Sequence, residues 1–90
     1  MANADQIATA FTALSHKRRV AIFRALRPEG PQGLSHGELQ SRTGLTHMTL
    51  THHLKPMVAA GLVSRRIKGT YTYHSLKPAA VFDVISELNP

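Results

Sequence analysis

Residues 35–57 read SHGELQSRTGLTHMTLTHHLKPM, and this stretch decides the fold. Ser35 and Glu38 have the spacing of a capping box, in which each side chain accepts a hydrogen bond from the other residue's amide. The short helix that follows is expected to end near Thr43–Gly44, because glycine readily takes the left-handed conformation that ends helices. Thr46 is suited to cap a second helix. The stretch therefore predicts two helices joined by a tight turn, a helix-turn-helix.

The second helix of this motif has one apolar face. Leu50, Leu54 and Met57 recur at helical spacing, so we expect them to be buried. Pro56 lies in the same helix and lacks the amide N–H that a helix interior uses. We therefore expect Pro56 to kink or end the helix.

Two further helices are expected before this motif. Ile7, Phe11 and Leu14 recur at helical spacing, and Ser15 is suited to cap a second helix. Residues 28–33, PEGPQG, read as the loop between these helices and the motif.

A hairpin and a last helix are expected after the motif. Residues 62–67 and 71–75 read as two strands that turn at Lys68–Gly69. Residues 78–89 read as a helix that starts with proline and has an apolar stripe. The sequence thus predicts a mostly α fold with a small β-hairpin, a winged helix-turn-helix of four helices, a hairpin and a fifth helix, in one domain over residues 1–90.

Charge is concentrated in the middle of the chain. All eleven Lys and Arg residues lie between Lys17 and Lys77, where Glu29 and Glu38 are the only acids, so this stretch carries +9. A basic middle between acidic ends is typical of a surface that binds a polyanion, because neutralised phosphates release counterions. The charge pattern therefore favours nucleic acid as the partner.

Several other classes of protein are disfavoured by what the sequence lacks. The absence of cysteine excludes disulfides, thiolate metal sites and thiol redox sensing. No catalytic motif occurs, and no two histidines stand three or four residues apart, so we expect neither an enzyme nor a cofactor nor a metal site. No membrane span and no secretory signal are evident, which predicts a cytoplasmic protein.

Four segments in order resemble the ArsR family of bacterial winged-helix repressors. ALSHKRRVAIF at 13–23 is similar to the family's "aLsdptRlrIL", TLTHHLK at 49–55 to its "tvSqHLk", AGLV at 60–63 to its "aGLV", and GTYTYHSL at 69–76 to its "GrxvyYrL". The resemblance implies a dimeric repressor whose terminal helices form the interface and whose fourth helix enters the major groove. Thr70 departs from the pattern, since the family often has a basic residue there.

The outward face of the fourth helix supplies candidate contacts to double-stranded DNA. At about 100° per residue, Met48, His52 and Lys55 point away from the core, whereas His47 and His53 lie nearer the buried side. Hydroxyl, imidazole and methionine groups suit base edges, and cations suit phosphates. The predicted DNA-binding residues are Thr46, His47, Met48, Thr49, Thr51, His52, Lys55, Arg65, Arg66 and Lys68. His53 is expected to be mainly structural.

The predicted hairpin would form the wing of the fold. Tyr71 and Tyr73 share one face of their strand and are expected to pack under the wing, so that the basic side chains of the hairpin are free to contact DNA. The terminal helices, about 3–14 and 78–89, carry more apolar residues than flanking helices usually bury, which favours a homodimer. The predicted interface consists of Ile7, Phe11, Val81, Val84, Ile85 and Leu88.

We therefore predict a transcriptional regulator that binds an inverted-repeat operator as a homodimer. One alternative is a repressor that responds to a metal or ligand at a site without cysteine. Two others are a non-specific architectural DNA-binding protein and a protein-interaction domain of the same fold.

Overall fold

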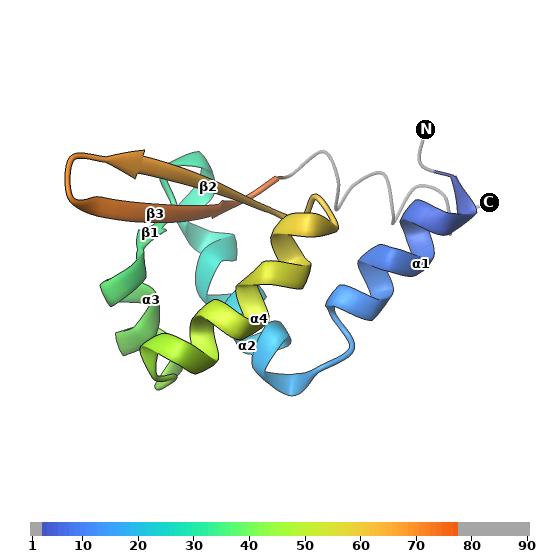
Figure 1. The fold of residues 1–90 in the computed structure, drawn as a ribbon, viewed down its shortest axis with the longest axis horizontal. Helices are drawn as coiled ribbons and strands as arrows, with labels where there is room; N and C mark the ends of the chain where they lie inside the picture. Colours follow the sequence, from blue (N-terminus) through green and yellow to red (C-terminus); the bar gives the residue numbers. More distant parts are fainter. Residues whose placement is uncertain (1–2, 78–90) are drawn as a thin grey trace.

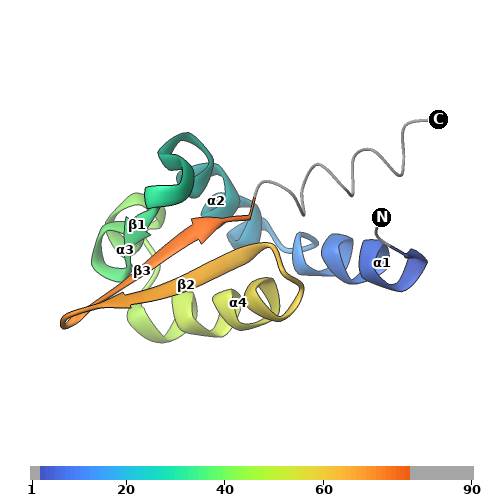
Figure 2. The same cartoon turned by 90° about the horizontal axis from the view of Figure 1, so that it is seen from above.

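The computed structural model describes residues 3–77, which form a helical body and a three-stranded antiparallel sheet (Figure 1). The tip of the hairpin and helix α1 lie at opposite ends of this part of the molecule in both Figure 1 and Figure 2. The elements in chain order are α1 (Ala4–Ala13), α2 (Lys17–Leu26), the 3-10 segment η1 (Arg27–Gln32), β1 (Leu34–Ser35), α3 (His36–Thr43), α4 (His47–Ala59), β2 (Val63–Lys68) and β3 (Tyr71–Leu76).

The predicted helix-turn-helix is confirmed as α3 and α4. Ser35 and Glu38 form the expected capping box at the start of α3. Gly44 ends α3 in the left-handed conformation with φ 70°, and Thr46 caps α4 by accepting from the amide of Thr49. Of the two outcomes expected for Pro56, a kink or an end of the helix, the end is wrong, because α4 continues to Ala59. A proline so near the C-terminal end removes only one hydrogen bond of an otherwise packed helix.

The two upstream helices are confirmed, but Ser15 does not cap the second one. His16 is the N-cap of α2, and its Nδ1 accepts from the amide of Arg18 at 3.1 Å. The Ser15 hydroxyl instead donates to the carbonyl of Thr12 at 2.6 Å. The hydroxyl of Ser15 is thus bound to the end of α1, which leaves the cap to the next side chain.

The predicted hairpin is confirmed as β2 and β3, and a third short strand joins it. Leu34 of β1 pairs with His74 of β3, so β3 is the middle strand. The predicted loop at residues 28–33 lies largely in η1, with Gly30 at non-helical angles. Gly33 follows with φ 67°, and a Cβ at this position would overlap the carbonyl oxygen of His74. The chain can therefore approach β3 this closely only with glycine here.

The core lies between the helices and the sheet. Leu50, Leu54 and Met57 are buried in it, as their spacing predicted. The other buried apolar residues are Ala10, Ala13, Ile22, Leu26, Leu34, Leu39, Leu62 and Val63. Because α4 contributes three of these side chains, its opposite face is held at a fixed orientation toward solvent.

The predicted last helix, 78–89, lies outside the described residues. Within residues 3–77, no helix is long and apolar enough to cross a membrane.

Candidate nucleic-acid interface

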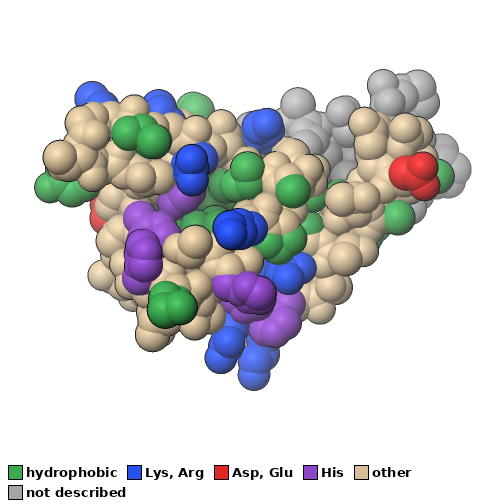
Figure 3. Space-filling view, in the orientation of Figure 1, with side chains coloured by type: hydrophobic (Ala, Val, Ile, Leu, Met, Phe, Trp, Pro, Cys, Tyr) green, Lys and Arg blue, Asp and Glu red, His purple; other side chains and the backbone are tan. Residues whose placement is uncertain are grey.

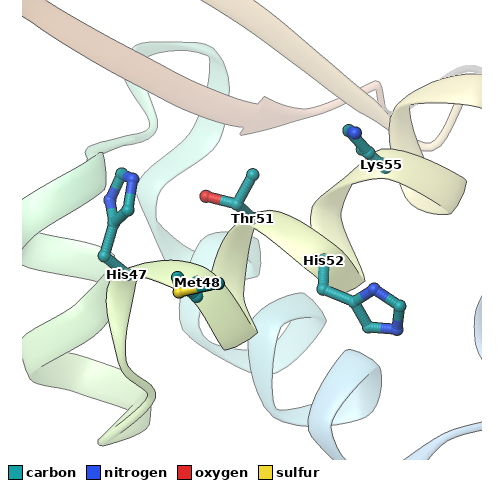
Figure 4. Close-up of a pocket in the computed structure, with 5 residues that line it drawn as sticks. All are labelled: His47, Met48, Thr51, His52 and Lys55. Atoms are coloured by element: carbon teal, nitrogen blue, oxygen red, sulfur yellow. The ribbon is translucent and has the colours of Figure 1, made fainter.

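The outward face of α4 is open to solvent over its first two turns. Met48 is 81% exposed, and His47, His52 and Lys55 are exposed as well. Together with Thr51 these side chains line a shallow hollow of about 240 Å³ (Figure 4). The expectation that His47 lies nearer the buried side is wrong, because its side chain is exposed at the start of the helix, with its ring centre 4.7 Å from that of His36. His53 is buried as expected, with 4% of its surface exposed.

The side chains on this face point in different directions. His47, Thr51 and Lys55 point toward the side of the hairpin, whereas His52 points the opposite way, toward α1 and α2 (Figure 4). Met48 lies between these two directions. The helix therefore offers an uncharged, flexible group at its centre and polar groups on either side.

Thr46 and Thr49 are both engaged in the cap of α4. The Thr46 hydroxyl oxygen accepts from the Thr49 amide at 3.2 Å and lies 3.0 Å from the Thr49 hydroxyl oxygen. Their side chains are thus fixed at the helix start, next to His47 and Met48.

The three wing residues predicted to contact DNA lie on two different faces of the wing. Arg65 pairs in register with His74, and both line a hollow of about 360 Å³ that also includes His47 and Thr51 of α4. Arg66 and Lys68 alternate with Arg65 along β2 and line a different hollow, where Glu29 and Glu38 are also found. Arg65 is therefore the wing cation on the α4 side.

The two wing tyrosines differ in exposure. Tyr73 is half-buried, and the guanidinium of Arg66 lies 5.3 Å from the centre of its ring. The expectation that Tyr71 packs under the wing is wrong, because it is 62% exposed. Tyr71 stands at the first position of β3, next to the turn of the hairpin.

Two histidines far apart in the sequence, half-buried His36 and buried His74, form a pair under the wing. Nδ1 of His36, at the start of α3, lies 3.1 Å from Nε2 of His74 in β3. His74 is only 3% exposed, and its burial, next to His36 and Arg65, lowers its pKa to about 4. Burial and the neighbouring His47 also lower the pKa of His36. We call this the wing-side pair; it is neutral at pH 7 and links α3 to the sheet.

Three other histidines, His16, His52 and His53, gather on the opposite side of α4. The ring centres of His16 and His53 are 4.5 Å apart, and those of His52 and His53 are 5.2 Å apart. Nε of Arg19 donates to Nδ1 of His53 at 3.3 Å. Burial and then these positive neighbours, with Arg18, lower the pKa of His53. We call His16, Arg18, Arg19, His52 and His53 the α2-side cluster.

Sequence reasoning missed both histidine groups because it examined only spacings within one helix. His36 and His74 are 38 positions apart, and His16 and His53 are 37 apart. Among the described residues, no three His, Asp or Glu side chains are arranged to hold a metal ion. One signal was visible: the first turn of α2 has three cations and no acid.

The proposed dimer residues are described only in part. Phe11 on α1 is 47% exposed, whereas Ile7 is half-buried and packs against the core. Val81, Val84, Ile85 and Leu88 lie outside the described residues.

Comparisons with known proteins agree with this fold. Residues 14–66 match a helix-turn-helix domain family. The chain is 34% identical over 97% of its length to the HTH-type transcriptional regulator YgaV of Escherichia coli (strain K12), covering 86% of that protein. It is 30% identical over 86% of its length to the arsenical resistance operon repressor of Bacillus subtilis (strain 168), covering 71% of it.

A solved structure has the same fold. It is that of the homodimeric winged helix-turn-helix DNA-binding domain of Mb0332 from Mycobacterium bovis, described as a possible ArsR-family regulator. The TM-score is 0.75 at 24% identity, over 93% of this chain and 77% of that one. Together with the two relatives and the exposed face of α4, these matches show that the chain belongs to the ArsR family of winged helix-turn-helix transcriptional regulators, which bind DNA and are not enzymes.

Proposed function

We propose that the protein is a homodimeric repressor that binds an inverted-repeat operator, with α4 of each protomer in a major-groove segment. The observation that carries this proposal is the uncovered outward face of α4, which a fixed core orients toward solvent. An α-helix fits the major groove, where each base pair presents a distinct pattern of groups.

The α4 residues divide into base-reading and backbone-binding groups. Met48 is suited to contact a thymine methyl group, and Thr51 and His47 are suited to hydrogen bonds with base edges. Lys55 is suited to a phosphate, as is Arg65 on the adjacent face of the wing. Thr46 and Thr49 present the capped start of the helix to the DNA. Arg66 and Lys68 bind phosphates only where the DNA reaches the reverse face or the tip of the wing.

The homodimer is supported by the exposure of Phe11 on α1. A large aromatic side chain that is 47% exposed at the end opposite to the wing tip is suited to a protomer interface. We assign the remaining contacts to Ile7 and to the apolar stripe at Val81, Val84, Ile85 and Leu88, as their spacing predicts. Repression is proposed because a relative that is 30% identical is named a repressor.

Thiol reagents are not expected to release the protein from DNA by acting on this chain, because the sequence contains no cysteine. This distinguishes the chain from any regulator that senses arsenite or oxidants through sulfur.

Selection of duplexes from a random pool, followed by competition, tests the proposal. A specific regulator retains the selected operator against a thousandfold or so excess of random DNA, whereas an architectural protein does not. Met48→Ala is expected to reduce discrimination between operator variants by about 1–3 kcal/mol while binding to random DNA changes little. Val58→Ala, which shortens another exposed apolar side chain of α4, is the control. Equal losses for operator and random DNA in Met48→Ala would contradict base reading by α4.

Sedimentation tests the dimer. Phe11→Lys is expected to give monomers, because it places a charge in the apolar interface. Thr9→Lys adds the same charge two residues away, on the other side of α1, and is expected to leave the dimer intact. If Phe11→Lys sediments as a dimer, the interface lies elsewhere.

A further inference from the structure

The start of α2 concentrates positive charge where its own helix does not benefit from it. Lys17, Arg18 and Arg19 occupy the first turn, which has no acid. Cations at a helix N-terminus are unfavourable, because the helix dipole is positive there. Lys17 and Arg18 therefore gain nothing from their place in the helix, whereas a negatively charged partner would be favoured beside them.

These cations lie beside the outward face of α4. Arg19 is held in place by bonds from its guanidinium to Nδ1 of His53 at 3.3 Å and to the carbonyl of Thr12 at 3.2 Å. His53 in turn touches the rings of His16 and of His52, the α4 residue that points toward α2 (Figure 4). Histidine and basic side chains form a continuous patch on this face, at its lower edge in Figure 3.

No carboxylate of the described residues neutralises the patch. The one ion pair in residues 3–77 joins Arg42 to Glu29. Glu38 is engaged in its capping box, and Asp5 lies in the first turn of α1. Because no carboxylate opposes Lys17, Arg18 and Arg19, the patch carries a net positive charge. Lys17, Arg18, His16 and His52 are exposed, so a ligand can reach them.

We propose that the α2-side cluster, with Lys17, binds the DNA backbone as a phosphate site separate from the wing. The inference rests on the proposed function and adds a second backbone anchor to it. A phosphate fits because it is the only group that duplex DNA presents as a repeated charge, and neutralising it releases counterions.

Salt dependence tests the phosphate contact. Arg18→Ala and Lys17→Ala are expected to lower affinity for operator and random duplexes by the same factor. Each is expected to flatten the slope of log affinity against log salt by about one unit. Arg24→Ala removes the same charge from the last turn of the same helix and is the matched control. If Arg18→Ala and Lys17→Ala do not differ from Arg24→Ala, the site does not exist.

The two proposals fail in distinguishable ways. If no operator emerges from the random pool but Arg18→Ala still weakens binding to random DNA, specific regulation fails and the phosphate site stands. If an operator is selected and Arg18→Ala matches Arg24→Ala, the phosphate site fails and specific regulation stands.

Discussion

The two sides of α4 carry the same residue type in different physical states. On the wing side, half-buried His36 is hydrogen-bonded to His74, which is 3% exposed. On the α2 side, His16 and His52 are exposed and stand among arginines. Burial makes the first group a neutral connection between elements, whereas exposure next to cations makes the second a receptor for negative charge.

The largest expected effect is on the stability contributed by the wing-side pair. His74→Ala is expected to lower the free energy of unfolding by about 2–4 kcal/mol, because it leaves a cavity and deprives His36 of its hydrogen-bond partner. His52→Ala, on the other side of α4, is expected to change it by less than about 0.5 kcal/mol. Urea unfolding measures both. Similar losses in the two variants would show that the two sides do not differ.

A smaller loss of folding stability is expected when the pH is lowered. His74 has a pKa of about 4 when folded and an ordinary value of 6.5 when unfolded, so below 6.5 the unfolded chain binds a proton that the folded chain excludes. Stability is therefore expected to fall as the pH drops from about 6.5 toward about 4. Denaturant midpoints at a series of pH values measure this loss. His74→Gln is expected to reduce it, leaving the part due to His36 and His53, whose pKa values are also lowered.

The smallest expected effect concerns the electrostatic neighbour of the pair. Arg65→Ala is expected to raise the pKa of His74, because the positive charge of Arg65 helps to lower it. Arg66→Ala removes an equal charge from the reverse face of the wing and is the control. Titration of the His74 ring by NMR distinguishes them. A shift of the same size in both variants would contradict the separation of the two faces.

The sequence was sufficient for elements that local chemistry determines. The capping box at Ser35, the left-handed Gly44 and the cap at Thr46 each depend on residues within one turn, and all three are confirmed. The α4 face was predictable for the same reason, because Leu50, Leu54 and Met57 define the helix orientation.

The missed features depend on contacts between distant segments. β1 is two residues long and exists through its pairing with β3, so no periodicity reveals it. The expected cap at Ser15 failed because its hydroxyl had a partner in α1. The histidines of each group come from segments that lie far apart in the sequence. The wing-side pair and the α2-side cluster form only because α3, β3 and α2 pack around α4.

Gly33 has a consequence for how this protein tolerates change. Its backbone contacts the carbonyl of His74, and a side chain there would displace the middle strand together with the wing-side pair and Arg65. In a library that randomises every position in turn, we expect position 33 to return glycine alone, although it lies on a different segment from every predicted DNA contact. Mutational sensitivity at this site would therefore report the placement of the wing rather than recognition of DNA.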